Sequence, residues 1–399
     1  MMNTDVALGL NFDLTDDQKL IRDSVKDFVE QYVKPTVIER DETCKFPHDI
    51  VKKFAEMGFM GMVHPEEFGG SNVDYVSFAL AIEEIARYDA SLALTVASHT
   101  SLCSGHIALA GTHEQKVKFL TPLAKGEKLG GWGLTEPGSG SDASNMKTTA
   151  VLDGNEWILN GAKIFITQGT VGDIFTVLAV TDRTKGTKGI SAFIVEKGTK
   201  GFSSGPKMRK LGMNTSDTSE IYFEDCRIPK ENLLGELNYG FIDTMKILDS
   251  GRIGIAALGV GIARGSMEES IQYSNERKQF GTAIYENQAI KWKVVNMAVQ
   301  TDAARLLVLR AAWLKDQGRP YTKEASMAKL FSSELATQAA LDAIQIHGGY
   351  GYTKEYHVER FVRDAKLLEI GEGTSEVQRM VIGKLLQKEF INKIFRVMG

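Results

Sequence analysis

Glu372 is the residue of this chain whose surroundings best suit acid–base chemistry. It stands between Gly371 and Gly373, in a turn directly ahead of a strongly periodic helical segment. Glycines let a backbone approach a ligand closely, and a helix start offers unpaired amides and a positive dipole end. A base placed here could reach a bound substrate while neighbouring amides polarise it. The turn could also be no more than a helix start capped by Thr374, and both interpretations stay open.

A loop of small residues and hydroxyls, residues 131–142, is the second candidate for ligand binding. Pro137 makes its bend rigid, and Thr135, Ser139 and Ser141 supply hydroxyl groups. Such a loop can press backbone amides against an anionic or heterocyclic ligand. It lacks the Gly-Lys-Ser/Thr of a P-loop and the strand–loop–helix context of a Rossmann fingerprint. The loop is therefore either a binding loop of another kind or a linker between domains.

Residues 275–281 and 345–352 suit phosphate binding, because they combine cations, glycines and aromatic side chains. An arginine fork and glycine amides fit a pyrophosphate, and an aromatic ring can pack on an adenine. Both segments can equally be helix C-caps. Arg252, alone on an apolar helical segment, is either an ion-paired core cation or a ligand contact. The residues concerned in the two segments are Arg277, Lys278, Phe280, Gly348, Gly349 and Tyr350.

Composition excludes several classes of function. The chain has 399 residues, which is enough for two or three domains, and a net charge of −4, which provides no basic field for nucleic acid or an anionic membrane. Cys44, Cys103 and Cys226 form no Cys-x-x-Cys pair, which indicates a reducing compartment and argues against a disulfide frame or zinc site. No His-x-x-x-His pair occurs, and we expect no metal.

Neither a targeting segment nor a membrane span is expected. Residues 1–10 lack a charged region followed by an apolar run, and no stretch approaches about 18 uninterrupted apolar residues. We therefore expect a cytoplasmic protein.

Hydrophobic periodicity divides the chain into three predicted domains, at residues 1–125, 126–238 and 239–399. The first is helical: Thr15 and Gln18 form a capping box, a second helix opens after Pro47, and residues 90–110 are small and apolar enough for a buried helix. The third is helical again, with breaks near Gly281, Gly318 and the Gly348–Gly349 pair.

The middle domain is predicted to be all β. Its strand patterns are short, evenly spaced and not interleaved with helices, which predicts an antiparallel barrel or sandwich. The fold class is thus α+β and multidomain: helical, β, helical. The strand segments are residues 156–159, 175–180, 190–195 and 220–223.

Taken together, the motifs make the chain resemble the acyl-CoA dehydrogenase family from end to end. They occur in the family's order over nearly the whole length, and the family's architecture is also helical–β–helical, with a C-terminal four-helix bundle. The segments that carry the resemblance are 134–142, 160–167, 277–281, 345–352 and 363–366, which leads into 371–374.

The resemblance implies FAD as the cofactor. The loop after residue 131 would line one side of the flavin, with Leu134 and Thr135 against its ring, and Arg277 would reach the FAD of a neighbouring subunit. Many relatives have tryptophan at the position of Phe165. The implied cofactor residues are Trp132, Leu134, Thr135, Gly140, Ser141, Phe165, Thr167, Arg277, Gln279, Phe280, Gln288, Gln345, Gly348, Gly349, Thr374 and Glu376.

The implied reaction desaturates an acyl-CoA thioester to the 2-enoyl-CoA. Glu372 falls on the position of the family's catalytic base and would take the α proton, while FAD takes the β hydride. The resemblance also implies a homotetramer built as a pair of dimers, and an electron-transferring flavoprotein that accepts the electrons. Ser141, Gly251, Arg252 and Gly373 are the implied substrate contacts.

The acyl group is expected to be short, and possibly branched or ring-bearing because Gly371 leaves room. Residues 369–377 look closest to the isovaleryl branch, but that branch places its base at the position of Gly251. Residues 248–255 and 101–103 instead look like short-chain and butyryl-CoA dehydrogenases.

Two other functions stay open. An acyl-CoA oxidase would use the same base and pass electrons to oxygen, although such oxidases are usually much longer. A non-catalytic DNA-binding relative should carry a basic C-terminal surface. Residues 377–399 contain five basic residues, but they also contain Glu389 and the whole chain is acidic.

Overall fold

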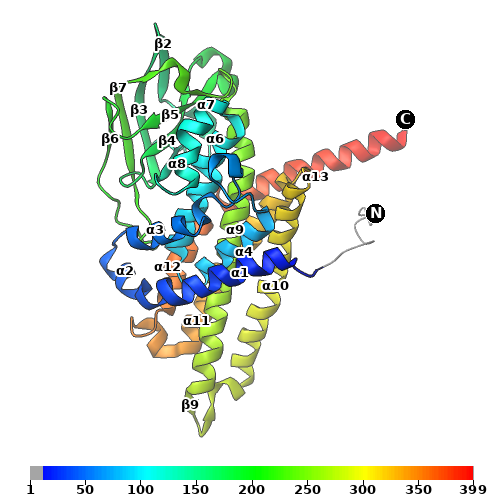
Figure 1. The fold of residues 1–399 in the computed structure, drawn as a ribbon. Coiled ribbons are helices and arrows are strands. Elements are labelled where there is room, and N and C mark those ends of the chain that lie inside the picture. Colours follow the sequence, from blue (N-terminus) through cyan, green and yellow to red (C-terminus); the bar gives the residue numbers. More distant parts are fainter. Residues whose placement is uncertain (1–11, 399) are drawn as a thin grey trace.

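The first part of the chain is helical, as predicted. The computed structural model describes residues 12–398 (Figure 1). Thr15 forms the predicted capping box with Gln18, and Pro47 precedes the second predicted helix. The helices of this part are α1 (Asp16–Phe28), α2 (Val37–Thr43), α3 (His48–Glu56), α4 (Tyr75–Ala86), α5 (Ala90–Ser98), α6 (Gly105–Ala110), α7 (His113–Gln115) and α8 (Thr121–Ala124). A π-helical segment, His99–Ser104, joins α5 to α6, so residues 90–110 form one nearly continuous helical run.

The middle part is a β-sheet, and all four predicted strand segments lie within its strands. Its order is β6-β7-β3-β2-β4-β5-β8, with β1 beside β4. The strands are β1 (Gly130–Gly133), β2 (Thr149–Asp153), β3 (Glu156–Thr167), β4 (Ile174–Val180), β5 (Ile190–Glu196), β6 (Phe202–Ser204), β7 (Thr218–Pro229) and β8 (Leu233–Leu234).

The sheet is mixed, whereas the sequence predicted antiparallel pairing throughout. β1 runs parallel to β4, from Gly130 beside Ile174 to Gly133 beside Val177, and β2 meets β4 in parallel at Thr149 and Val180. The remaining pairs are antiparallel. The difference arises because β1 enters the sheet directly from the first helical part, so no hairpin fixes its direction.

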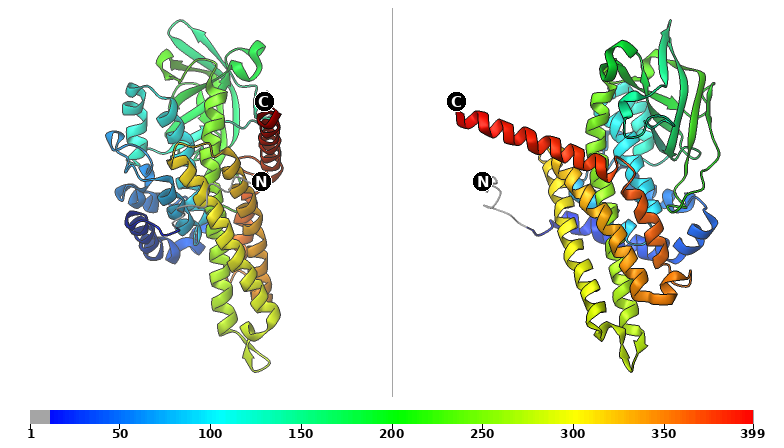
Figure 2. Two further views of the ribbon diagram at one scale, coloured as in Figure 1. Left: turned by 90° about the vertical axis from the view of Figure 1, so that its right-hand side faces the viewer. Right: turned by 180° about the vertical axis from the view of Figure 1, so that it is seen from behind.

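The third part consists of long helices. Helices α9, α10 and α11 run side by side, and α13 leaves the body of the molecule and extends away from it (Figure 2). A short hairpin, β9 (Lys278–Gln279) and β10 (Thr282–Ala283), separates α9 from α10. The helices are α9 (Gly240–Glu276), α10 (Gln288–Asp316), α11 (Thr322–His347), α12 (Val358–Leu368) and α13 (Ser375–Met398).

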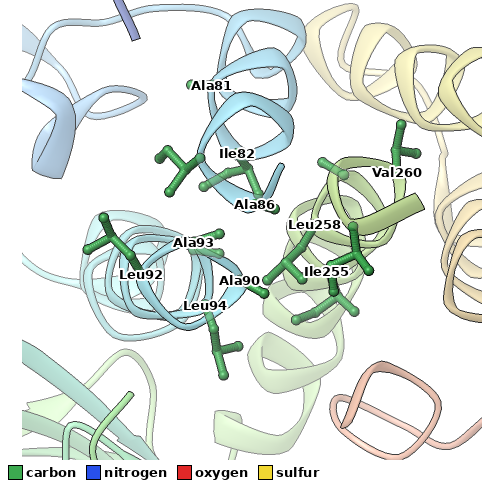
Figure 3. Packing of buried hydrophobic residues seen from close by; sticks show 14 of the residues in the cluster. Ala81, Ile82, Ala86, Ala90, Leu92, Ala93, Leu94, Ile255, Leu258 and Val260 are labelled. Atoms are coloured by element: carbon green, nitrogen blue, oxygen red, sulfur yellow. The ribbon is translucent and has the colours of Figure 1, made fainter. Parts of the chain in front are cut away.

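The core joins the two helical parts. Helix α9 packs against α4 and α5 through small and branched side chains, among them Ala86, Ala90 and Leu258 (Figure 3). Close packing is possible because α9 carries glycines: a Cβ at Gly261 would lie 2.5 Å from the Glu83 carbonyl oxygen. This contact fixes α9, which carries Gly251 and Arg252, against the rest of the molecule.

Residues 12–398 contain neither a membrane-spanning helix nor a metal-binding cluster. None of the helices there has the length and apolar character that a bilayer crossing needs. In the same residues, no cluster of three or more histidine, cysteine, aspartate or glutamate side chains has a geometry that could hold a metal ion.

Candidate functional site

The turn between α12 and α13, residues 371–374, carries the candidate base and is called the base turn below. Glu372 has φ 53° and Gly373 has φ 94°, so two successive residues adopt the left-handed region. This is uncommon for a residue with a side chain. The Thr374 hydroxyl accepts a hydrogen bond from the Val377 N–H at 3.3 Å. The turn is therefore a capped helix start, as one interpretation of the sequence held, and it also presents Glu372.

The Glu372 carboxylate points at helix α9. A Cβ built on Gly251 would lie 2.1 Å from Glu372 Oε2 and 2.9 Å from Leu102 Cδ2, so the absence of a side chain at position 251 makes room for the carboxylate. Oε2 is buried and has no hydrogen-bond partner among residues 12–398. A buried carboxylate oxygen without a partner is costly, which points to a group that acts on a ligand.

Burial raises the pKa of Glu372 to about 7, although the charges of Lys329 and Arg252 oppose the shift. A carboxylate of this basicity is poised to accept a proton near neutral pH. The Glu372 backbone N–H is also available, since it donates to no acceptor in the described part of the chain. One residue thus offers a base and a hydrogen-bond donor side by side.

Arg252 is an ion-paired core cation, which was one of its two interpretations. Its guanidinium is 2.8 Å from Asp249 Oδ1 and 3.4 Å from the Ser326 hydroxyl. Burial lowers the pKa of Arg252, and the charges of Asp249 and Glu372 oppose this.

Lys329, on α11, completes the surroundings of the base turn and was not selected from the sequence. Its side chain is buried, and its Nζ donates to the Gly373 carbonyl oxygen at 2.7 Å. A lysine in the middle of a helix ordinarily indicates a solvated surface, so no local pattern could have identified it.

A second buried lysine supports the loop of residues 131–142. Lys163 Nζ lies 2.7 Å from Glu136 Oε1 and 3.1 Å from the Leu134 carbonyl oxygen. Glu136 also accepts the Thr148 N–H at 3.0 Å. Neither Lys163 nor Glu136 was named as a site residue, although both lie within motifs of the resemblance. Their ion pair holds the backbone of the loop in place.

The predicted cofactor residues of this loop differ in exposure. Leu134 is buried in an apolar cluster, whereas Ser141 and Gly140 are exposed, and nothing lies within 4 Å of a Cβ built on Gly140. Trp132 donates from Nε1 to His106 Nδ1 at 3.3 Å. Phe165, on β3, has φ 60° and is 65% exposed, which displays an aromatic ring at the surface.

A cavity of about 480 Å³ brings together several of the other predicted residues. Arg277, Gln279, Gly348 and Gly349 line it, and the Arg277 guanidinium lies 5.7 Å from the centre of the Tyr350 ring. The remaining predicted residues of this region lie outside the lining: Phe280 is fully exposed, and Gln288 and Gln345 are exposed.

The structure separates this cavity from the base turn. Gly251 contacts Glu372, and the end of α9 at Glu276 is 25 positions further along the same straight helix. At 1.5 Å per residue this corresponds to roughly 38 Å. A single ligand that contacts Glu372 would have to span this whole length to reach Arg277 of the same chain.

Comparisons with known proteins agree over residues 15–387, apart from short gaps between the three matches. Three family models match in succession: "Acyl-CoA dehydrogenase, N-terminal domain" at residues 15–127, the middle domain at 131–226, and the C-terminal domain at 238–387. The chain is 50% identical over 379 residues to a short-chain specific acyl-CoA dehydrogenase of Clostridium acetobutylicum, covering 95% of this chain and 100% of the relative.

Two further relatives bear on the site. The structure of butyryl-CoA dehydrogenase from Megasphaera elsdenii superposes with a TM-score of 0.93 at 45% identity, covering 95% of this chain and 100% of the other. The CarC subunit of a caffeyl-CoA reductase–Etf complex from Acetobacterium woodii is 45% identical, covering 94% of this chain and 99% of the relative.

Proposed function

The chain belongs to the acyl-CoA dehydrogenase family, and from this premise we propose that it desaturates a short acyl-CoA thioester to the 2-enoyl-CoA, with FAD as cofactor. The observation that carries the proposal is Glu372, whose buried Oε2 has no partner in residues 12–398 and whose carboxyl pKa is raised to about 7.

The reaction requires a base and a donor at one place. Glu372 accepts the proton from the carbon next to the thioester carbonyl, and its own N–H donates to that carbonyl oxygen as negative charge develops there. Glu372 Oε2 is buried, and the missing side chain at Gly251 leaves the carboxylate its room beside α9. When bound, FAD supplies the acceptor for the β hydride, which no side chain provides.

The residues fit the cofactor at two places. Gly138, Gly140, Gly348 and Gly349 are exposed, and a Cβ on any of them would meet nothing within 4 Å, so a ligand has room to approach the backbone there. Arg277 provides the charge that a pyrophosphate needs. The proposal assigns FAD contacts to all the cofactor residues given in the sequence analysis. It assigns substrate contacts to Ser141, Arg252, Gly251 and Gly373.

A homotetramer, built as a pair of dimers, accounts for the separation of the two cofactor regions. The loop at Phe165 and the cavity at Arg277 would hold one FAD only if they came from different subunits. Helices α10 and α13 expose apolar side chains suited to contacts between copies, among them Trp292, Val299 and Phe390. The boundaries 1–125, 126–238 and 239–399 remain our proposal for the domains.

The proposed electron acceptor is an electron-transferring flavoprotein, supported by the Etf complex of the CarC relative. Phe165 and the partly exposed Trp132 mark the face on which it would dock transiently. A cytoplasmic location is part of the same proposal, and cell fractionation would test it.

The experiment is a panel of acyl-CoAs mixed anaerobically with the purified, FAD-loaded protein. We expect butyryl-CoA or a branched analogue to bleach the flavin fastest. The panel includes 3-phenylpropionyl-CoA because the CarC relative is named as a subunit of a caffeyl-CoA reductase, and caffeyl-CoA is an aromatic thioester. Arg277→Ala should weaken FAD binding about tenfold or more, because a hydrogen bond to a charged group is lost. A protein that copurifies with NAD and no FAD, or a flavin that no acyl-CoA reduces, would contradict the proposal.

A further inference from the structure

Lys329 reaches the base turn from a different helix. It lies in α11 (Thr322–His347), is 0% exposed, and donates from Nζ to the Gly373 carbonyl oxygen at 2.7 Å. Gly373 directly follows Glu372, so this hydrogen bond acts one peptide away from the candidate base.

The base turn needs to be held. Glu372 at φ 53° occupies a conformation that costs a residue with a side chain free energy unless the surroundings impose it, whereas Gly373 adopts its φ of 94° readily. Gln378 Nε2 donates to the Gly373 carbonyl at 3.0 Å and to the Glu372 carbonyl at 3.3 Å, so it shares this task with Lys329. The two side chains come from α13 and α11, and together they fix the carbonyl groups of Glu372 and Gly373.

The positive charge of Lys329 has no carboxylate of its own. No carboxylate oxygen of the described residues lies within 4.0 Å of its Nζ, unlike Lys163, which is 2.7 Å from Glu136. Of the acidic groups that face it, Glu369 lies 2.7 Å from Lys366 and Glu376 is exposed. Glu372 is the acidic group whose charge acts most strongly on Lys329.

The other charged and titratable groups around Glu372 are Asp249 and Arg252 on α9 and Tyr321, the residue directly before α11. Arg252 attracts the Glu372 carboxylate but is already bound to Asp249, and Tyr321 faces Arg252. Burial lowers the pKa of Lys329 to about 8, while the charge of Glu372 raises it.

We propose that Lys329 is a positioning residue for the base turn: its ammonium group holds the Gly373 carbonyl, and its charge attracts the Glu372 carboxylate. The proposal rests on the proposed function, in which Glu372 is the base. Lys329 touches neither substrate nor cofactor in this arrangement and acts through Glu372.

The test uses the FAD-loaded protein with three substitutions at one position. Lys329→Met removes charge and donor, Lys329→Gln keeps a donor without charge, and Lys329→Arg keeps both. Lys315→Met is the matched control, because Lys315 is half-buried and also has a pKa lowered to about 8, yet it donates to Ser250 and Tyr321.

The first measurement is the pH dependence of flavin reduction by butyryl-CoA. Glu372 must be ionised to accept a proton, and loss of a nearby cation makes ionisation harder. The acid limb is the part of the pH–rate curve in which the rate falls as pH is lowered and Glu372 becomes protonated. In Lys329→Met this limb should therefore move to higher pH by about one unit, and the rate well below it should fall about tenfold. Lys329→Gln should show the same shift, whereas Lys329→Arg and Lys315→Met should keep the acid limb of the parent.

The second measurement is independent of turnover. The infrared band of the protonated Glu372 carboxyl, assigned by its loss in Glu372→Gln, should titrate about one unit higher in Lys329→Met. If Lys329→Met does not fold, Lys329→Gln carries both tests. An unchanged acid limb and an unchanged band in the neutral variants would overturn the proposal. Failure of the parent to be reduced by any acyl-CoA would instead overturn the proposed function, and the infrared titration would still test Lys329.

Discussion

Lys163 lies under the loop of residues 131–142, and Lys329 lies under the base turn. Both are fully buried, and each donates to a main-chain carbonyl of the segment it supports, Leu134 in one case and Gly373 in the other. The two neighbouring carboxylates nevertheless differ. Glu136 is surrounded by donors: Lys163 and the N–H groups of residues 147 and 148. Glu372 Oε2 has none among residues 12–398.

The pKa of each carboxyl group follows the number of hydrogen-bond donors around it. Burial raises the pKa of Glu136, but the charge and hydrogen bonds of Lys163 and its other donors outweigh burial and leave that pKa below its usual value. Burial raises the pKa of Glu372 to about 7, and the more distant Lys329 and Arg252 do not cancel it. A carboxylate whose oxygens all accept hydrogen bonds maintains structure, whereas a carboxylate with an unpaired oxygen stays available for proton transfer.

The largest effect expected from this comparison is on the rate in Glu372→Gln. The amide keeps the size of the side chain but cannot accept the α proton, so flavin reduction by a short acyl-CoA should fall by more than about 10⁴-fold. Stopped-flow bleaching measures it. FAD binding and the cooperative fold should survive, and bleaching at the parent rate would leave Glu369 or Glu376 as the next carboxylates to test.

Lys163→Met should act on stability instead. Removing one member of a buried ion pair leaves Glu136 charged and partly unpaired, which typically costs about 3–5 kcal/mol. Urea unfolding should show this loss together with weaker FAD binding, while the pH limb of any remaining activity stays in place. If Lys163→Met kept full stability, the two lysines would not differ as described.

The pH dependence of stability should reveal the raised pKa of Glu372. In the unfolded chain Glu372 releases its proton near 4.5, and in the folded protein near 7, so between these values the folded state binds more protons. The free energy of unfolding then falls as pH rises through this window. Glu372→Gln does not titrate and should gain at most about 3 kcal/mol relative to the parent over it. Urea unfolding at about pH 5 and pH 8, with saturating FAD, measures the difference; no gain at the higher pH would contradict the raised pKa.

Gly251→Ala should have the smallest effect. The added Cβ would lie 2.1 Å from Glu372 Oε2, so the carboxylate must turn aside. Such overpacking costs roughly 1–3 kcal/mol, and where the transition state bears this cost the rate should fall about five- to 150-fold. Gly254→Ala is a control on the same helix, because its Cβ would meet Ala97 at 3.3 Å and no site residue. Equal losses in both variants would assign the effect to helix packing.

Local patterns predicted the helical–β–helical order, because capping residues and strand periodicity are properties of short segments. The Thr15 capping box and the strand around residues 174–180 needed no distant partner to be recognised. The parallel contact of β1 with β4 was missed, because pairing direction depends on where the preceding helices deliver the chain.

The candidate base was selected from the sequence, but its environment was not. Glycines on both sides marked Glu372, whereas Lys329 is 43 positions away and becomes its neighbour only when α11 packs against the base turn. Gly251 was named from the resemblance as a substrate contact, but the 2.1 Å approach of a Cβ there to Glu372 Oε2 could be seen only in the structure. Sequence patterns identify reactive groups more readily than the groups that tune them.

The left-handed backbone at Glu372, φ 53°, also has a stereochemical consequence. The turn delivers the carboxylate to one side of the substrate only. The two hydrogens on the α-carbon of a straight acyl chain differ little in reactivity in free solution, but only one of them can face Glu372 in the proposed complex. A thioester labelled with deuterium at one of these two positions should therefore lose all of its label on desaturation, and the thioester labelled at the other position should keep it.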